Sequence, residues 1–251
     1  MREEVYQKTT LDILGKVGCD YIVFTGSSTA QEVEDAYFRA LKEGKKEGYT
    51  PVLVPSDDIL AEWLGILEDE DYSREKVIAS HEDGKAFLHK CLEEYTSYWA
   101  KEGDCNVETF MEDLIGDTEA AEGEEINYFT SYINYGGEGI KEVILFKIPV
   151  KNPWEVVAWL PMGGWNACPP AEEMMAVAKY WYEQHGAVIA SVTHDTLEFY
   201  VEDPVKDGET ARELAKEMYS FCTDIVDQGS GSIAELCETI KQSRVWFFWW
   251  D

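Results

Sequence analysis

The chain has 251 residues, 45% of them hydrophobic, and its 50 acidic and 21 basic residues give a formal net charge of −29. Its 9 Trp, 14 Tyr and 10 Phe residues exclude the composition of a disordered chain. The negative charge argues against nucleic acid and anionic membranes as partners, and no apolar run approaches the ~20 residues of a membrane-spanning helix.

The first residues and the cysteines indicate the compartment. The opening segment MREEVYQKTT contains no apolar run of the signal-peptide kind. The 6 cysteines are widely spaced and form no Cys-x-x-Cys motif, which excludes a zinc knuckle and a thioredoxin-type site. We expect buried free thiols in a cytoplasmic protein that carries neither a metal nor a cofactor.

The chain begins with alternating strand and helix signals. Residues 21–24 (YIVF) are typical of a buried strand, and Thr29 and Glu32 form a capping box in front of a helix. A second strand is expected at residues 51–54 (PVLV), followed by a second helix. This order predicts an α/β region within residues 1–150.

The middle of the chain is expected to be helical before it returns to strands. An apolar stripe over residues 87–99 indicates a long helix, and Asn106 is placed to cap a shorter one. From Glu102 to Glu125 there are 10 acidic residues and no basic residue, and the end of this stretch is expected to be a mobile loop. Strands are expected within residues 126–150.

Residues 151–251 show the order strand, helix, strand, strand, helix, helix, strand. The strands are expected at residues 156–162, 187–193, 196–201 and 244–250. This order is the split β-α-β, or ferredoxin-like, pattern with one extra helix. We therefore expect an α/β protein in which a ferredoxin-like C-terminal unit packs against the N-terminal α/β region.

The terminal segment RVWFFWW is aromatic on both faces of its expected strand. One face carries Val245, Phe247 and Trp249, and the other carries Trp246, Phe248 and Trp250. Both faces should be covered, because an exposed strand of this kind promotes aggregation. We expect the N-terminal region to cover one face, so that both regions share one core.

Five stretches resemble a known bacterial family, the domain-of-unknown-function 4253 family, over about residues 156–251. They are LPMGGWNACP, YWYEQHGA, VTHDTLEFYV, CTDIVDQGSGS and VWFFWWD. The resemblance implies no activity, but it implies a set of polar motif positions. These are Trp165, Asn166, His194, Asp195, Asp224, Asp227 and Gln228, together with the terminal Trp250 and Asp251.

Three of these groups are candidates for chemistry, and each has a structural alternative. His194 and Asp195 could act as a general base or as metal ligands, or they could simply form the hairpin turn. Asp224 and Asp227 could bind a cation or perform acid–base work, or they could shape a loop. Trp165 and Asn166 could hold a ligand, or the former could fill the core while the latter caps a helix.

No phosphate-binding Walker motif and no Gly-x-Ser-x-Gly elbow occurs in the chain. Two functions remain open. The first is a non-enzymatic acidic binding protein, of the immunity or inhibitor type, that occludes a basic protein partner. The second is a small-ligand-binding or hydrolytic enzyme whose site lies at the Trp165, His194 and Asp227 loops.

Overall fold

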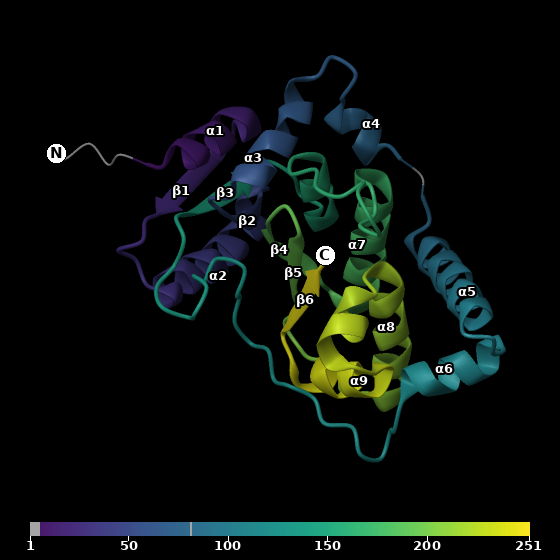
Figure 1. Cartoon of the computed structure of the whole chain (residues 1–251). Coiled ribbons are helices and arrows are strands. Elements are labelled where there is room, and N and C mark those ends of the chain that lie inside the picture. The colour runs from purple at the N-terminus through teal and green to yellow at the C-terminus, as the bar shows by residue number, and fades with distance from the viewer. Residues whose placement is uncertain (1–5, 81) are drawn as a thin grey trace.

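A computed structural model describes residues 6–80 and 82–251, which build a mixed six-stranded sheet with helices on both faces (Figure 1). Residues 1–5, part of the segment in which we expect no signal peptide, lie outside the described residues. The strands are β1 (Asp20–Phe24), β2 (Thr50–Pro55), β3 (Val143–Ile148), β4 (Val188–Val192), β5 (Thr196–Tyr200) and β6 (Val245–Trp249). Their order across the sheet is β1-β3-β2-β4-β5-β6.

The α/β class is confirmed, and helices occupy most of the remaining regular structure. The α-helices are α1 (Lys8–Val17), α2 (Ala30–Glu47), α3 (Asp58–Trp63), α4 (Arg74–Ile78), α5 (Gly84–Glu102), α6 (Val107–Ile115), α7 (Ala171–His185), α8 (Gly208–Phe221) and α9 (Ile233–Gln242). Two short 3-10 helices, η1 (Leu64–Glu68) and η2 (Pro153–Ala158), and a π-helical turn, η3 (Ile225–Ser230), complete the chain. Among the residues described, no helix combines the length and the apolar character that a bilayer crossing requires.

The helix starts expected at Thr29 and Asn106 are confirmed by their caps. Thr29 and Glu32 form the capping box of α2, and Asn106 accepts a hydrogen bond from Thr109 at the start of α6. Ser232 caps α9 through the backbone N–H of Glu235. Such caps use side-chain oxygens to satisfy backbone donors at a helix start, which is why they can be read from the sequence alone.

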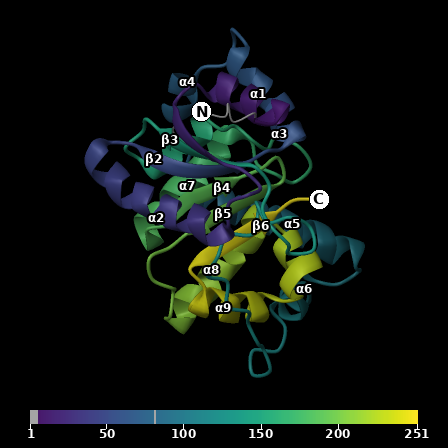
Figure 2. The same ribbon diagram turned by 90° about the vertical axis from the view of Figure 1, so that its left-hand side faces the viewer.

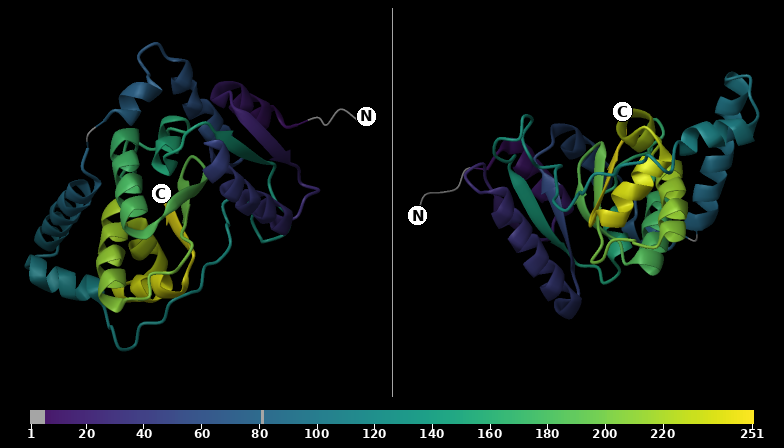
Figure 3. Two further views of the ribbon diagram at one scale, coloured as in Figure 1. Left: turned by 180° about the vertical axis from the view of Figure 1, so that it is seen from behind. Right: turned by 90° about the horizontal axis from the view of Figure 1, so that it is seen from below.

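The two faces of the sheet bury different sets of side chains. One face packs against α7 and α8, and the other packs against α2 and the segment 126–140. Figure 2 shows α2 lying across its face of the sheet. The view from below in Figure 3 shows the layers in sequence: α2, the strands, α7 and α8, and then α5 beyond them.

Strand β1 lies at the edge of the sheet and is not the buried strand that its apolar residues predict. Tyr21 is 47% exposed and Ile22 is 44% exposed. The strand pairs only with β3, in antiparallel register. A short apolar run indicates a strand but does not show how many neighbours it has, so the burial of β1 was wrongly predicted.

The strand expected in residues 126–139 is absent apart from a single bridge between Ile133 and Ile140. Several backbone donors of this segment bond to side chains of other elements instead of to a neighbouring strand: Phe129 N–H donates to Glu34, and Thr130 N–H donates to Glu198. The glycines that follow, Gly136, Gly137 and Gly139, have positive φ angles and turn the chain. The segment 142–150, in contrast, forms β3 as expected.

The ferredoxin-like strand order is not adopted. Residues 156–162, expected as a strand, form the end of η2 and an irregular turn, and Pro153 opens that helix. Val156, Val157 and Ala158 are all buried, so the apolar run shows no alternation that could separate a strand from a buried helix. The strand next to β4 is β2 from the N-terminal region, paired in parallel.

The terminal segment forms the last strand of the sheet, as expected. Strand β6 pairs with β5 at the sheet edge, and Trp246, Phe248 and Trp250 are buried on the face covered by α7 and α8. On the other face Val245 is buried, but Phe247 is 37% exposed. The N-terminal region reaches this strand through Ile126, whose carbonyl accepts a hydrogen bond from Val245.

Candidate functional site

Two polar residues meet where the parallel strands β2 and β4 end. Asp57 follows β2 and caps α3, and His194 follows β4 at the hairpin turn. Because β2 and β4 run in the same direction, their carboxyl ends lie at the same end of the sheet. The topology therefore brings together two residues that are 137 positions apart in the chain.

The imidazole of His194 lies between two carboxylates. Its Nδ1 is 2.7 Å from Oδ2 of Asp57, and its Nε2 is 3.4 Å from Oδ2 of Asp195. The backbone N–H of His194 also donates to Asp57, at 3.1 Å. Burial raises the pKa of Asp57, but the hydrogen bonds from Leu60 and His194 outweigh it, and the pKa lies below its ordinary value.

Aromatic rings pack beside His194, and hydroxyl groups bond to the neighbouring Asp195. The His194 ring meets Trp63 edge-to-face at 5.9 Å, and Trp63 lies 5.6 Å from Trp165. Thr193 and Thr196 donate hydrogen bonds to Oδ1 of Asp195. Trp165 is half-buried against the core, and its indole N–H has no hydrogen-bond partner in the described structure.

A second network joins three of the motif positions to the C-terminus. Asn166 donates from Nδ2 to the carbonyl of Asp251 at 2.7 Å, and the N–H of Asp251 donates to Oδ2 of Asp224 at 3.0 Å. Gln228 donates from Nε2 to Oδ1 of Asp224. Asn166 therefore does not cap α7, whose N-cap is Pro170; it anchors the chain end.

The side chain of Asp227 takes no part in this second network. Its carboxylate accepts hydrogen bonds from Tyr95 at 2.6 Å and from Tyr219 at 3.3 Å. Burial, together with this carboxylate, raises the pKa of Tyr95. The pocket beside Asp227 includes neither Asp224 nor His194, so the structure separates the two aspartates instead of pairing them on one face.

Asp224 and Gln228 line a groove of about 540 Å³ between residues 122–126, η3, α9 and β6. We call it the acid–aromatic groove. Its functional groups are the carboxylates of Glu122, Glu124, Asp224 and Glu235 and the rings of Phe247 and Trp249. No lysine, arginine or histidine lines it.

The loop that forms one wall of this groove is fixed to α9. The N–H of Glu124 donates to the Thr239 hydroxyl at 3.0 Å, and Gln242 donates to the carbonyl of Gly123 at 2.8 Å. Within the described residues, the carboxylates of Glu122 and Glu124 form neither an ion pair nor a hydrogen bond. The groove therefore presents uncompensated negative charge beside aromatic surface.

Metal binding has no support from the side-chain geometry. Across residues 6–80 and 82–251, no three His, Cys, Asp or Glu side chains gather in the manner of a metal site. The carboxylates of Asp57 and Asp227 are occupied by donors from the protein itself.

Sequence reasoning missed Asp57, Glu122 and Glu124 as members of these sites. Asp57 follows a strand and precedes a helix, a position from which a strand-to-helix site could have been predicted. Nothing local connects Glu122 or Glu124 to β6, which lies more than a hundred residues later in the chain. Only the fold brings the acidic loop against the terminal aromatic strand.

The fold and these networks define an α/β protein in which a mixed sheet carries polar loops at its strand ends. Residues 144–251 match the model of a family described as a domain of unknown function (DUF4253). This confirms the resemblance and extends it to include β3. None of the curated proteins and none of the solved structures searched matches the chain.

Proposed function

We propose that this protein is a non-enzymatic acidic binding protein, of the immunity or inhibitor type, that occludes a basic protein partner. The observation that carries the proposal is the acid–aromatic groove, which combines four carboxylates and two aromatic rings with no cation. A lysine or arginine side chain suits such a groove, because its charge pairs with carboxylates and its cation and methylene stem pack on rings.

The charge of the whole chain supports the same proposal. A net charge of −29 attracts a basic partner over long range and repels acidic ones. We infer that the same charge leaves nucleic acid and anionic membranes outside the set of partners. The 6 cysteines are free thiols, which supports a cytoplasmic location because such thiols persist where the compartment is reducing.

The proposal is tested by capture from native cell lysate at low salt, with the wild-type protein and two variants on the column. The groove variant is E122Q/E124Q, and the control E108Q/E112Q removes two exposed carboxylates from α6. Both variants change the net charge equally, so long-range attraction weakens equally in both.

We expect a basic protein that binds the wild type and the control in near-stoichiometric amount, that elutes with salt, and that the groove variant no longer retains. Equal retention by both variants would show that the groove takes no part in binding. Binding that persists unchanged in high salt would contradict an electrostatic interface. Quenching of tryptophan fluorescence by the purified partner in the wild type but not in Trp249→Phe would locate the contact.

A second candidate function, acid–base chemistry at His194, is favoured by the 2.7 Å contact between Asp57 Oδ2 and His194 Nδ1. A carboxylate that accepts a hydrogen bond from Nδ1–H leaves the Nε2 lone pair to act as a base. Nitrogen-15 NMR of the His194 ring at pH 7 tests this candidate function. A singly protonated ring supports this candidate, and a ring that keeps both protons contradicts it.

A further inference from the structure

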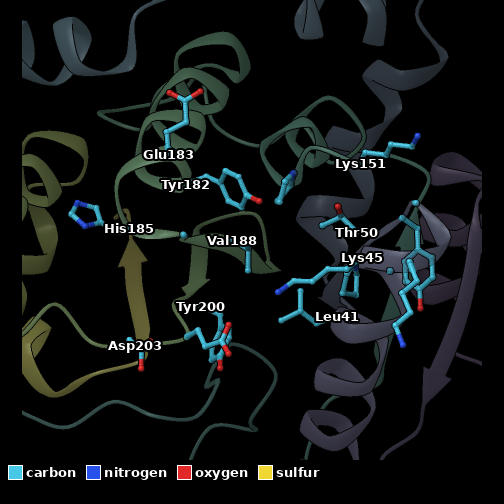
Figure 4. Close-up of a pocket in the computed structure, with 18 residues that line it drawn as sticks. Leu41, Lys45, Thr50, Lys151, Tyr182, Glu183, His185, Val188, Tyr200 and Asp203 are labelled. Atoms are coloured by element: carbon cyan, nitrogen blue, oxygen red, sulfur yellow. The ribbon is translucent and has the colours of Figure 1, made fainter.

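A cleft of about 730 Å³ lies at the opposite end of the sheet from Asp57 and His194. It opens where β2 and β4 begin and β5 ends, between the C-terminal ends of α2 and α7 (Figure 4). This volume lies in the range of pockets that hold small molecules. Neither the acid–aromatic groove nor the polar loops at the other end of the sheet contribute to it.

The two walls of the cleft carry opposite charges. One wall is formed by α2 and the turn after β3 and presents Lys45, Lys46 and Lys151. The other wall is formed by α7 and the turn after β5, and its lining includes the acidic residues Glu183, Glu202 and Asp203. In Figure 4 the side chain of Lys45 reaches across the cleft toward Tyr182 and Tyr200.

These six charged side chains are exposed, and none has a partner among the described residues. In the part of the chain that the structure describes, none of them forms an ion pair or a side-chain hydrogen bond. Three unpaired lysines on one wall are notable in a chain in which 50 acidic residues outnumber 21 basic ones. The cleft keeps the opposite charges apart, so that both remain available to a ligand.

The floor between the walls adds neutral polar groups. Tyr182, His185 and Tyr200 line the cleft, and neither the tyrosine hydroxyls nor the imidazole nitrogens form a hydrogen bond within the described residues. Burial lowers the pKa of His185, whose ring packs edge-to-face on Trp246 and points away from the other lining side chains in Figure 4. The tyrosine rings provide surface for an apolar or aromatic group.

We propose that this cleft binds a small zwitterion of dipeptide size. The carboxylate of the ligand pairs with the lysine wall, its ammonium group pairs with the carboxylate wall, and its side chain packs on Tyr182 and Tyr200. A ligand with only one charge would leave the other wall unpaired and would be repelled by it. A zwitterion therefore satisfies both walls at once.

The test uses three probes in isothermal titration: alanyl-tyrosine, its N-acetyl form, which lacks the ammonium group, and its C-terminal amide, which lacks the carboxylate. We expect alanyl-tyrosine to bind and each blocked form to bind about tenfold more weakly. Equal affinity for all three probes would overturn the proposal, and so would no binding of alanyl-tyrosine at roughly 10 mM.

Two charge variants assign the ligand groups to the walls. K45Q/K151Q should weaken alanyl-tyrosine about tenfold without weakening the amide, and E183Q/D203N should weaken alanyl-tyrosine equally without weakening the N-acetyl form. The matched controls on α5, K85Q/K90Q and E93Q/E94Q, change the net charge by the same amounts and should bind as the wild type does. Losses in the controls equal to those in the wall variants would show that net charge, and not the cleft, governs binding.

Discussion

Oε1 of Glu198 accepts two hydrogen bonds from Thr130, one from its backbone N–H at 2.7 Å and one from its hydroxyl at 3.0 Å. Ser131 donates to Oε2 of the same carboxylate from its hydroxyl, at 2.7 Å. Glu198 is fully buried in β5. This strand residue, together with Glu34 and the bond from Val245 to Ile126, therefore holds the segment 126–140 on its face of the sheet without regular strand pairing.

Replacing this carboxylate should destabilise the protein. Glu198→Ala leaves the buried donors of Thr130 and Ser131 without an acceptor, and we expect the free energy of unfolding to fall by about 3 kcal/mol. Urea unfolding followed by circular dichroism measures the loss. Glu62→Ala, which removes an exposed carboxylate from α3, serves as the control and should change the stability very little. A similar loss in both variants would contradict the role of Glu198.

The same group predicts a dependence of stability on pH. Burial raises the pKa of Glu198 above its ordinary value of 4.5, against the hydrogen bonds from Thr130 and Ser131 that lower it. The folded state therefore holds the proton more tightly than the unfolded state, so stability falls as pH rises from about 4.5 through the folded pKa. We expect the urea midpoint of the wild type to fall relative to that of Glu198→Gln as pH rises across this range. A constant difference would contradict the raised pKa.

Neighbouring aromatic residues of β6 should differ in their effect on stability. Phe248 is fully buried and stacks on Trp181 at 5.4 Å, whereas Phe247 is partly exposed on the opposite face. We expect Phe248→Ala to cost about 4 kcal/mol and Phe247→Ala about 1 kcal/mol in unfolding free energy. Removal of the last six residues deletes Trp246, Phe248 and Trp250 together and should prevent folding. Chemical denaturation of each variant checks this order.

Asp57 should stabilise the fold in two ways, as the N-cap of α3 and as the hydrogen-bond acceptor of His194. Asp57→Ala loses the hydrogen bonds to Ile59 and Leu60 and leaves the His194 backbone N–H without its acceptor, so we expect a loss of about 2 kcal/mol at pH 7. Asp57→Asn keeps a capping oxygen and should lose less. Because the pKa of Asp57 is lowered in the folded state, its contribution is present above the ordinary value of 3.8 and is lost as pH falls through the folded pKa. Thermal melts of the three proteins at pH 7 and near pH 2 test both statements.

The buried thiols should be unreactive in the folded protein. Burial raises the pKa of Cys222 to about 12 and also raises the pKa of Cys168, so neither forms much thiolate at pH 8. We expect a thiol reagent such as dithionitrobenzoate to titrate these two residues only after urea unfolding. Rapid reaction of all 6 cysteines in the native protein would contradict this.

Features that depend on neighbours along the chain could be predicted from the sequence. The caps at Thr29, Asn106 and Ser232, the hairpin at His194 and the terminal strand all depend on side chains within a few residues of one another. Features that depend on distant partners could not. The apolar run at 156–162 was wrongly predicted as a strand because burial on all sides removes the alternation that distinguishes a strand from a helix.

The same distinction between local and distant partners applies to the candidate sites. The family resemblance alone marked His194, Asp224 and Asn166 as polar motif positions and as candidates for a site. Which groups come together was decided by the tertiary structure: the parallel pairing of β2 and β4 brings Asp57 to His194, and the path of the acidic loop brings Glu122 and Glu124 to Trp249. Local sequence determines backbone preference and hydrophobic pattern, but the pairing of distant charges depends on strand order, which only the shared core of the whole chain selects.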